Sequence, residues 1–263
     1  MRRSSSGRTR RSTAQKTGEE TGSRPDERRL HIKAVLFDID GTILNCHGAG
    51  KNALIDAALD TLGTIGEMKR VDFQGKTDPV ILRESLGIWG FGSEADRDTV
   101  EKLKQRYFHY LGKYMYTHDS VVLPGIQPLL ERLSGCPGAI TGLLTGNFTE
   151  SAHIKLQRFG LDRYFRFGAY GDDAQHRNGL PPVAKKILLE RFDLDIPFED
   201  MVIIGDTVHD ITCARASGAV SISVGTGWTP RESLISENPD HFFDDLSDID
   251  RVMDAVLNGA GIR

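Results

Sequence analysis

The hydrophobic pattern of the chain consists of short apolar runs that end in polar or glycine-containing turns. The first run covers residues 34–37 and stops at Asp38, and similar runs cover residues 140–144, 201–204 and 220–224. The first run has no polar position, which is typical of a strand buried on both faces of a sheet. The pattern therefore predicts interior strands with polar residues at the points where they end.

Helical patterns occupy the segments between these runs. They cover residues 127–133, 151–159 and 183–192. The last of these segments follows two prolines, and proline favours the first turn of a helix. Strands that alternate with helices predict an α/β fold in which helices cover a parallel sheet. In such folds, ligands bind at the carboxyl ends of the strands.

Residues 47–120 break this alternation, because their pattern is helical throughout. Apolar positions recur at helical spacing within residues 54–62 and again within residues 100–114. We predict that residues 47–120 form a helical cap domain, and that residues 31–46 and 121–263 form the catalytic core. An insert placed directly after the first strand would lie over the strand ends and could act as a lid.

The first part of the chain, residues 1–30, differs in composition from the remainder. Within residues 1–29, nine basic side chains accompany four acidic ones, a net charge of +5 against −9 for the rest of the chain. The segment is rich in serine, threonine and glycine and has almost no large apolar side chains, so it cannot bury enough surface to fold. We predict a disordered basic tail.

Composition excludes several classes of protein. The net charge of −4 gives no sign of a nucleic-acid partner, and no apolar run approaches the roughly 18 residues that a membrane span requires. The three cysteines are scattered and odd in number, which does not fit a disulfide framework. We therefore expect a cytoplasmic protein with no membrane partner. The sequence does not determine the oligomeric state, for which we expect a monomer or a homodimer.

Two carboxylates stand two positions apart directly after the first strand, at Asp38 and Asp40 in the segment Asp38-Ile39-Asp40-Gly41-Thr42. At the end of a strand such side chains can point into one pocket. Because two close negative charges raise each other's pKa, a divalent cation with oxygen ligands would stabilise them. In the alternative interpretation, Asp40 and Gly41 only form a turn.

A second acidic signature follows the strand 201–204, in the segment Gly205-Asp206-Thr207-Val208-His209-Asp210. Asp206 is the better candidate for a metal ligand, and Asp210 would help to hold the site. In the alternative interpretation, Asp206 forms a turn and Asp210 is an acidic residue in the first turn of a helix, where a negative charge is favourable.

The loop Thr145-Gly146-Asn147 follows the strand 140–144 and precedes a helix. A hydroxyl group and free backbone N–H groups at the start of a helix suit an anion such as phosphate. Alternatively, Asn147 or Thr149 only caps the helix.

The three signatures end three separate apolar runs, in the order Asp-x-Asp-Gly-Thr, Thr-Gly-Asn and Gly-Asp-x-x-x-Asp. In this respect the chain resembles the haloacid dehalogenase superfamily, specifically its phosphoglycolate phosphatase-like branch. The resemblance covers residues 33–258, and residues 37–42 are its most specific segment. It implies a Rossmann-like core with a helical cap, a bound Mg²⁺ and an aspartyl-phosphate intermediate.

The resemblance also implies a role for each matching residue. Asp38 would attack phosphorus, and Asp40 would protonate the leaving oxygen and later activate water. Thr145 would hold the transferring phosphoryl group. Magnesium would bind Asp38, Asp206 and the Asp40 carbonyl oxygen, while Asp210 would support the site. Because a general acid must be protonated at the start, we expect Asp40 to have a higher pKa than Asp38.

The cation that normally accompanies these acids is not in its usual place. Relatives carry Lys or Arg before a proline ahead of the second acidic motif, where this chain has Leu180-Pro181. Arg177, about one turn upstream, and Lys185, about one turn downstream, are the substitutes. Arg177 is favoured because it lies in a glycine-containing loop that can bend toward the site, whereas Lys185 could be a solvated helix residue.

The expected substrate-binding residues come from three loops. They are Gly41, Gly146 and Asn147 of the core, and Gly75 and Lys76 of a polar glycine loop in the insert that resembles the substrate-selecting loop of this cap type. Lys76 could contact an anionic group of the substrate. In the alternative interpretation, the insert loop only caps the helix that follows.

The first functional hypothesis is a phosphatase that acts on a small phosphorylated metabolite such as phosphoglycolate. A phosphosugar mutase of the same fold would instead pass the phosphoryl group to another hydroxyl group. A phosphonate hydrolase would need a lysine in the cap that forms a Schiff base, for which Lys51 and Lys76 are candidates. A non-catalytic binding module is the third class, and the presence of all four core acids argues against it.

Overall fold

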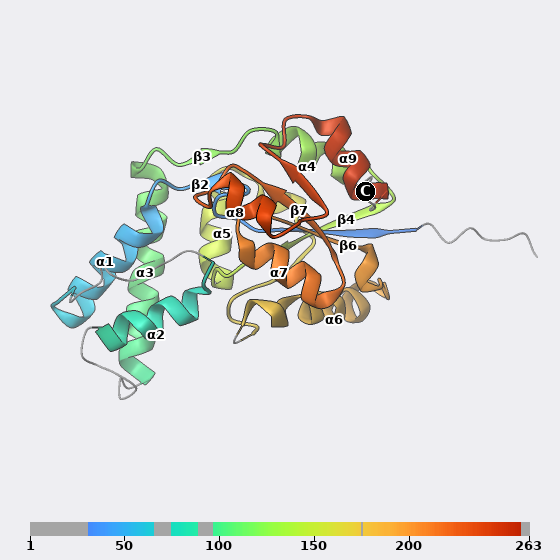
Figure 1. The fold of residues 1–263 in the computed structure, drawn as a ribbon. Coiled ribbons are helices and arrows are strands. Elements are labelled where there is room, and N and C mark those ends of the chain that lie inside the picture. Colours follow the sequence, from blue (N-terminus) through green and yellow to red (C-terminus); the bar gives the residue numbers. More distant parts are fainter. Residues whose placement is uncertain (1–30, 66–74, 89–96, 175, 259–263) are drawn as a thin grey trace, which may run out of the picture.

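A parallel sheet of six strands forms the centre of the protein (Figure 1). The computed structural model describes residues 31–65, 75–88, 97–174 and 176–258. The strand order is β5-β4-β1-β6-β7-β8. The strands are β1 (Lys33–Phe37), β4 (Ala139–Leu144), β5 (Phe167–Ala169), β6 (Met201–Gly205), β7 (Val220–Val224) and β8 (His241–Phe243).

Strand β1 lies between β4 and β6, and all five of its residues are buried. Val35 and Phe37 belong to one hydrophobic cluster, whereas Ala34 and Leu36 belong to a second cluster on the opposite face. Because successive side chains of a strand point to opposite faces, both faces of β1 need apolar residues. This requirement explains the uninterrupted apolar run.

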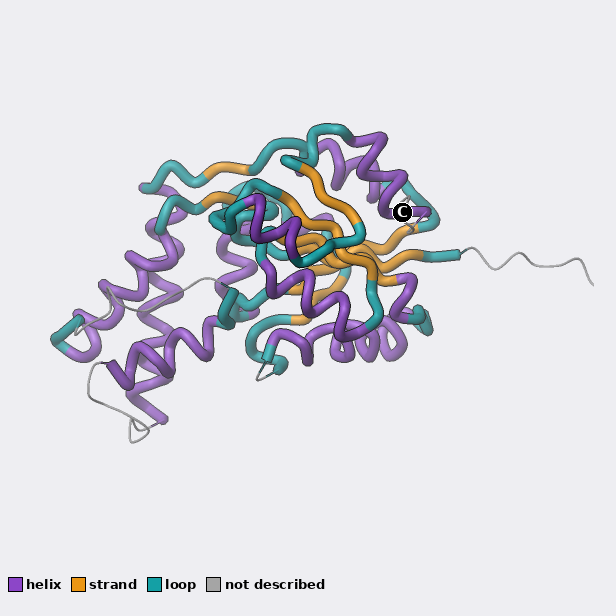
Figure 2. The backbone as a smooth tube through the Cα atoms, in the orientation of Figure 1, coloured by secondary structure: helices purple, strands orange, loops and turns teal. Residues whose placement is uncertain are grey.

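Helices cover both faces of the sheet (Figure 2). Residues of α4, α5 and α9 share the cluster of Phe37, and residues of α6 and α7 share the cluster of Leu36. The helices are α4 (Ile126–Ser134), α5 (Thr149–Gln157), α6 (Leu180–Phe192), α7 (Val208–Ser217), α8 (Arg231–Ser236) and α9 (Ile249–Asn258). The predicted α/β fold and its parallel sheet are confirmed.

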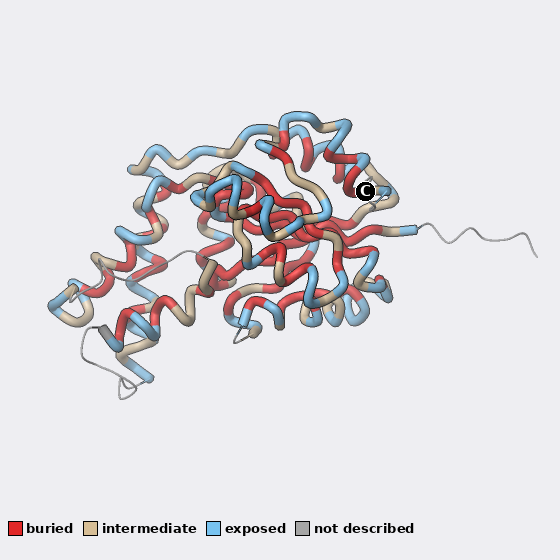
Figure 3. Tube along the Cα trace, viewed as in Figure 1, coloured by how far each residue is buried: buried red, intermediate tan, exposed pale blue. Residues whose placement is uncertain are grey.

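Three helices project from one end of the sheet (Figure 1). They are α1 (Ala49–Leu62), α2 (Asp78–Ile88) and α3 (Arg97–Thr117), and α1 packs along α3. A short antiparallel pair, β2 (Leu44–Asn45) and β3 (Val121–Val122), connects them to the core. Buried positions continue from the sheet into these helices (Figure 3).

The structure agrees with a helical insert between β1 and β4, which are the first two strands of the six-stranded sheet in chain order. The exact division into a core and a cap at residues 47 and 120 stays a prediction, and the predicted tail lies outside the described residues. Within the described part of the chain, no helix combines the length and the apolar character that crossing a membrane would require.

Candidate active site

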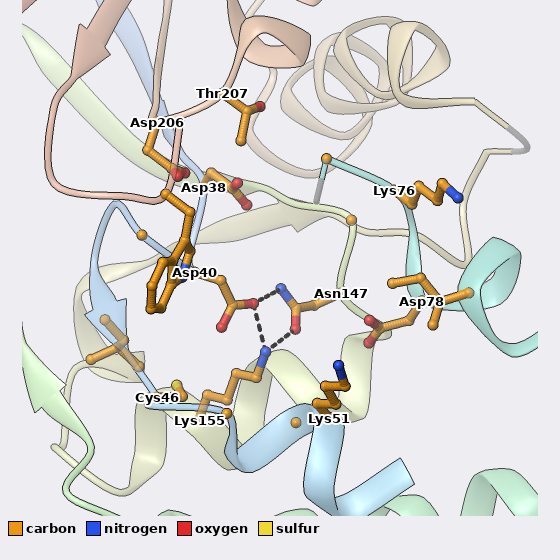
Figure 4. Close-up of a pocket in the computed structure, with 18 of the residues that line it drawn as sticks. Asp38, Asp40, Cys46, Lys51, Lys76, Asp78, Asn147, Lys155, Asp206 and Thr207 are labelled. Carbon is orange, nitrogen blue, oxygen red and sulfur yellow. Dashed lines mark hydrogen bonds and ion pairs between the residues drawn. The ribbon is translucent and has the colours of Figure 1, made fainter. Parts of the chain in front are cut away.

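The three polar signatures meet at the carboxyl edge of the sheet. Asp38 follows β1, Thr145 follows β4 and Asp206 follows β6, and these three strands are neighbours. Asp38 and Asp206 line a cavity of about 480 Å³ between the sheet and the inserted helices, together with Asp40 and Asn147 (Figure 4). Adjacent parallel strands therefore bring together residues that are more than 160 positions apart in the sequence.

A buried cluster of three carboxylates lies at this edge of the sheet, and two of them, Asp38 and Asp206, line the cavity. Asp38, Asp206 and Asp210 each offer an oxygen atom, and these atoms lie within 4.8 Å of one another. Burial raises the pKa of Asp38, and burial together with the other two carboxylates raises the pKa of Asp206 well above its usual value. Such a set of buried oxygen atoms fits a hard divalent cation such as Mg²⁺.

Arg177 is the cation that the structure brings to this cluster. Its guanidinium group lies 2.9 Å from Asp38 Oδ2 and also bonds to Asp210, and its side chain is almost fully buried. The arginine lies in a single 3₁₀ turn, Arg177–Gly179, directly before α6. A guanidinium in this position neutralises part of the charge of the three carboxylates and could also contact a phosphate oxygen beside Asp38.

The structure does not bring Lys185 to the site. Its ammonium group lies 2.6 Å from Asp195 Oδ1 and 2.7 Å from the carbonyl oxygen of Ile196. Lys185 belongs to α6, whose course carries it away from the strand ends. Of the two substitutes that the sequence offered, the geometry therefore favours Arg177, and Lys185 stabilises the connection that follows α6.

Asp210 serves both of the roles that the sequence left open. One carboxylate oxygen accepts hydrogen bonds from the Thr207 backbone N–H, at 3.1 Å, and from the Thr207 hydroxyl, at 2.7 Å. This reciprocal arrangement is a capping box at the start of α7. The other oxygen bonds to Arg177. Asp210 thus fixes the helix start and holds the arginine beside Asp38.

The loop after β4 is held by hydrogen bonds within the site. The buried Thr145 hydroxyl oxygen accepts bonds from the backbone N–H and the side-chain amide of Asn147, at 3.3 and 2.8 Å. Neither Asn147 nor Thr149 is the cap residue, since α5 begins after Phe148, which makes no side-chain cap bond. The alternative interpretation of a simple helix cap is therefore wrong.

Gly146 allows the inserted segment to approach the core. A side chain at this position would place a Cβ atom 2.6 Å from the Lys76 carbonyl oxygen, and the Gly146 carbonyl accepts a hydrogen bond from the Asp78 N–H at 2.7 Å. The Asp78 carboxylate in turn accepts bonds from the Phe148 N–H and the Ser151 hydroxyl at the start of α5. These contacts place residues 75–78 against the loop that follows β4.

Gly75 and Lys76 line the cavity, but the Lys76 ammonium group is paired outside the carboxylate cluster. Its ammonium group lies 2.7 Å from Glu84 Oε2 on α2. Figure 4 shows the side chain of Lys76 pointing away from Asp38 and Asp40. In this arrangement Lys76 does not contact the predicted catalytic acids.

Asp40 has a partner that the sequence reasoning missed. Its Oδ2 atom lies 2.6 Å from Lys155 Nζ and 2.9 Å from Asn147 Nδ2. Burial raises the pKa of Asp40, but the Lys155 charge and the hydrogen bonds lower it by more, so that it falls below its usual value. The pKa of Asp38 is raised. The predicted order of the two pKa values is therefore wrong in this structure, and Lys155 is the cause.

A signal for Lys155 does exist in the sequence. Buried positions of α5 include Ser151, Ala152, Lys155 and Leu156, which share one helical face. A lysine on such a face is unusual, because lysine is almost never fully buried without a partner. The partner itself could not be identified, since Asp40 lies 115 positions away.

Gly41 offers a test of how tightly the carboxylate cluster is built. Its backbone has φ of +82°, and a Cβ atom would lie 2.4 Å from Asp206 Oδ2. We expect Gly41→Ala to lower the free energy of unfolding by about 3 kcal/mol, from backbone strain and displacement of Asp206 together. Urea denaturation measures this loss, and Mg²⁺ binding should weaken in parallel.

Gly218→Ala is the matched control for that substitution. Gly218 also has φ of +82°, but a Cβ atom added there would meet nothing within 4 Å. This variant should lose only the strain component, about 1 kcal/mol, and bind Mg²⁺ as the wild type does. Equal losses in the two variants would show that Asp206 does not depend on close contact with Gly41.

Comparisons with known proteins identify the family of the chain. The haloacid dehalogenase-like hydrolase family matches residues 32–218. A protein named "Putative pyrophosphatase PpaX" from Caldanaerobacter subterraneus subsp. tengcongensis is 30% identical, over 82% of this chain and 92% of that protein. A phosphoglycolate phosphatase from Salmonella typhimurium is 26% identical, over 83% of this chain and 91% of that protein.

Solved structures show the same fold. A crystal structure described as a predicted phosphoglycolate phosphatase from Haemophilus somnus matches with a TM-score of 0.65 at 23% identity, and the match covers 85% of this chain and 98% of that one. The family match covers most of the chain. The predicted superfamily and the prediction of an enzyme are confirmed: the chain belongs to the haloacid dehalogenase-like hydrolases.

Proposed function

We propose that this protein is a magnesium-dependent phosphatase that hydrolyses a small phosphate monoester through a covalent intermediate on Asp38. The observation that carries the proposal is the meeting of three buried carboxylates and Arg177 beside the cavity that Asp38, Asp206 and Asp40 line. A nucleophile, an acid–base residue and a phosphate-binding cation are the parts that phosphoryl transfer to a carboxylate requires.

Binding of the substrate would use groups on both sides of Asp38. Arg177 and the Thr145 loop would hold the phosphoryl oxygens. Mg²⁺ would be held by Asp38, Asp206 and the Asp40 carbonyl oxygen, with Asp210 keeping Arg177 in place. When bound, the cation would draw negative charge from the phosphoryl group and so reduce its repulsion of the Asp38 carboxylate.

The chemistry would then proceed in two steps. An Asp38 carboxylate oxygen forms a bond to phosphorus while the bond to the leaving oxygen breaks, and Asp40 donates a proton to that oxygen. Asp40 next removes a proton from the water molecule that hydrolyses the acyl phosphate. The lowered pKa of Asp40 suits the second step. For the first step, an anionic phosphate beside Asp40 would raise that pKa.

The proposed substrate is a small phosphorylated metabolite of the phosphoglycolate type. The support comes from the relatives, one of which is a phosphoglycolate phosphatase and another of which is named as a pyrophosphatase. Residues of the inserted helices, including Lys51 and Tyr107, line the cavity, so these helices would contact the leaving group. A phosphosugar mutase and a phosphonate hydrolase remain the competing reactions.

Removal of the metal provides the direct test. Protein treated with a chelator should lose at least about 100-fold in hydrolysis of p-nitrophenyl phosphate, and added Mg²⁺ should restore the activity. A panel that contains phosphoglycolate and pyrophosphate, assayed by phosphate release without any phosphorylated activator, identifies the substrate. Absence of hydrolysis across the panel, or activity that is indifferent to the chelator, would contradict the proposal.

Two outcomes of the same assay favour the competing reactions. Phosphate transfer that appears only when a bisphosphorylated sugar is present indicates a mutase. Borohydride trapping of an aldehyde on Lys51 or Lys76 indicates a phosphonate hydrolase. The bond between Lys76 and Glu84 leads us to expect no trapping at Lys76.

A further inference from the structure

A buried lysine of the core, Lys155 on α5, occupies the wall of the cavity beside the proposed acid–base residue (Figure 4). Only 5% of its side chain is exposed. Its ammonium nitrogen lies 2.6 Å from Asp40 Oδ2 and 2.6 Å from Asn147 Oδ1. Both of these atoms belong to residues that line the cavity.

Burying an ammonium group is unfavourable unless it is paired and hydrogen-bonded. A second buried lysine is paired in the same way at the amino ends of the strands. Lys33, at the start of β1, lies 2.7 Å from Asp200. That pair lies outside the cavity, so its role is structural. Lys155 and Asp40 instead line the cavity, and 47% of the Asp40 side chain is exposed.

The contacts of Lys155 fix the position of the Asp40 carboxylate. Asp40 Oδ2 accepts bonds from both Lys155 and Asn147, and the Asn147 amide also donates to the Thr145 hydroxyl oxygen. These hydrogen bonds therefore connect the proposed acid–base residue Asp40 to the loop that follows β4.

A direct role in binding the phosphoryl group is the competing interpretation of Lys155. The cation next to the nucleophile is Arg177, at 2.9 Å from Asp38 Oδ2. The charged end of Lys155 is instead directed at Asp40, the residue proposed to protonate the leaving group. The contacts therefore favour action through Asp40.

We propose that Lys155 is a positioning residue that holds the Asp40 carboxyl group within reach of the leaving oxygen. This inference rests on the proposed phosphatase activity. In the step concerned, an Asp38 oxygen bonds to phosphorus, the bond from phosphorus to the ester oxygen breaks, and the Asp40 proton moves to that oxygen. Lys155 keeps its own protons throughout. Proton transfer needs a separation of about 2.6–3.2 Å, so loss of the hydrogen bonds would slow this step.

The dependence of kcat/KM on the basicity of the leaving group distinguishes a role of Lys155 in positioning Asp40 from a role in phosphate binding or in stability. p-Nitrophenolate departs readily without a proton, whereas the more basic phenolate of phenyl phosphate needs one. In Lys155→Met, kcat/KM for phenyl phosphate should fall by about 100-fold, and that for p-nitrophenyl phosphate by less than about tenfold. KM should change little for either substrate. Asp40→Asn should show the same preference, and the double variant should be no worse than Asp40→Asn alone.

Lys33→Met is the matched control, because it removes a buried, aspartate-paired lysine outside the cavity. It should lower stability but leave the ratio of the two kcat/KM values unchanged. If Lys155→Met does not accumulate as folded protein, Lys155→Arg keeps the charge, moves the nitrogen atoms, and should alter the ratio as well.

Equal losses for both substrates, or a rise in KM with kcat unchanged, would overturn the inference, because those results indicate phosphate binding or general disruption. A wild-type protein that hydrolyses neither aryl phosphate would instead contradict the proposed function itself. The two failures are therefore distinguishable.

Discussion

Replacement of Asp38 by asparagine is expected to lower kcat for phosphate ester hydrolysis by about 10⁴-fold or more. An amide is a far weaker nucleophile than a carboxylate, and no other acid of the cluster can take over. Asp210 is occupied by Thr207 and Arg177, and Asp206 follows a different strand. Steady-state kinetics with p-nitrophenyl phosphate and Mg²⁺ measure this loss.

The same substitution should leave the protein folded. Asp38 is one of three buried carboxylates, and burial raises its pKa above the usual value. Removing this charge relieves repulsion from Asp206 and Asp210, although Arg177 loses one of its two partners. We expect a melting temperature within a few degrees of the wild-type value, measured by circular dichroism.

Asp200→Asn is the control for the loss of a buried aspartate. Asp200 is paired with Lys33 at the amino ends of the strands, away from the cavity, so this variant should lose stability and keep its activity. If Asp38→Asn retained wild-type hydrolysis, the nucleophile would have to be another residue. If it lost activity only by unfolding, the experiment would show a structural role for Asp38.

The strands that build the site could be predicted because each carries enough apolar residues to be recognised alone. In β1, the two faces of the sheet both require apolar side chains, which leaves an uninterrupted run that ends at Asp38. Once a parallel sheet is assumed, its strand ends must lie at one edge. The meeting of Asp38, Thr145 and Asp206 then follows from the sequence.

The edge strands β5 and β8 could not be predicted in the same way. Each has only three residues, Phe167–Ala169 and His241–Phe243, and three positions carry too little pattern to distinguish a strand from a loop. Their place is determined by pairing with β4 and β7, which is a contact between distant parts of the chain.

The sequence also could not show which basic residues pair with the acids of the site. Arg177 and Lys185 stand at similar distances from the expected position, and only the path of the backbone decides between them. The 3₁₀ turn brings Arg177 to Asp38, whereas α6 carries Lys185 to Asp195. The pKa order of Asp38 and Asp40 was predicted wrongly for the same reason, because it depends on Lys155, whose position relative to Asp40 no local pattern reveals.

Replacement of Arg177 by methionine should have an effect on both activity and stability. The arginine side chain is 7% exposed and bonds to two aspartates, and breaking a buried ion pair by removing one partner typically costs about 3–5 kcal/mol. Asp38, Asp206 and Asp210 would then repel one another without a compensating charge. We expect a loss in kcat/KM of about 10³-fold, since the phosphoryl group also loses its cation.

Added Mg²⁺ should distinguish this electrostatic account from a simple packing defect. A cation binds more tightly where a nearby positive charge has been removed, so Mg²⁺ should raise the melting temperature of Arg177→Met by more than that of the wild type. Lys185→Met is the matched control and should change neither activity nor the response to Mg²⁺, because Lys185 pairs with Asp195 outside the cavity. If Lys185→Met lost activity while Arg177→Met kept it, the assignment of the phosphate-binding cation would be reversed. If Mg²⁺ stabilised Arg177→Met no more than the wild type, the three carboxylates would not be acting together on one ion.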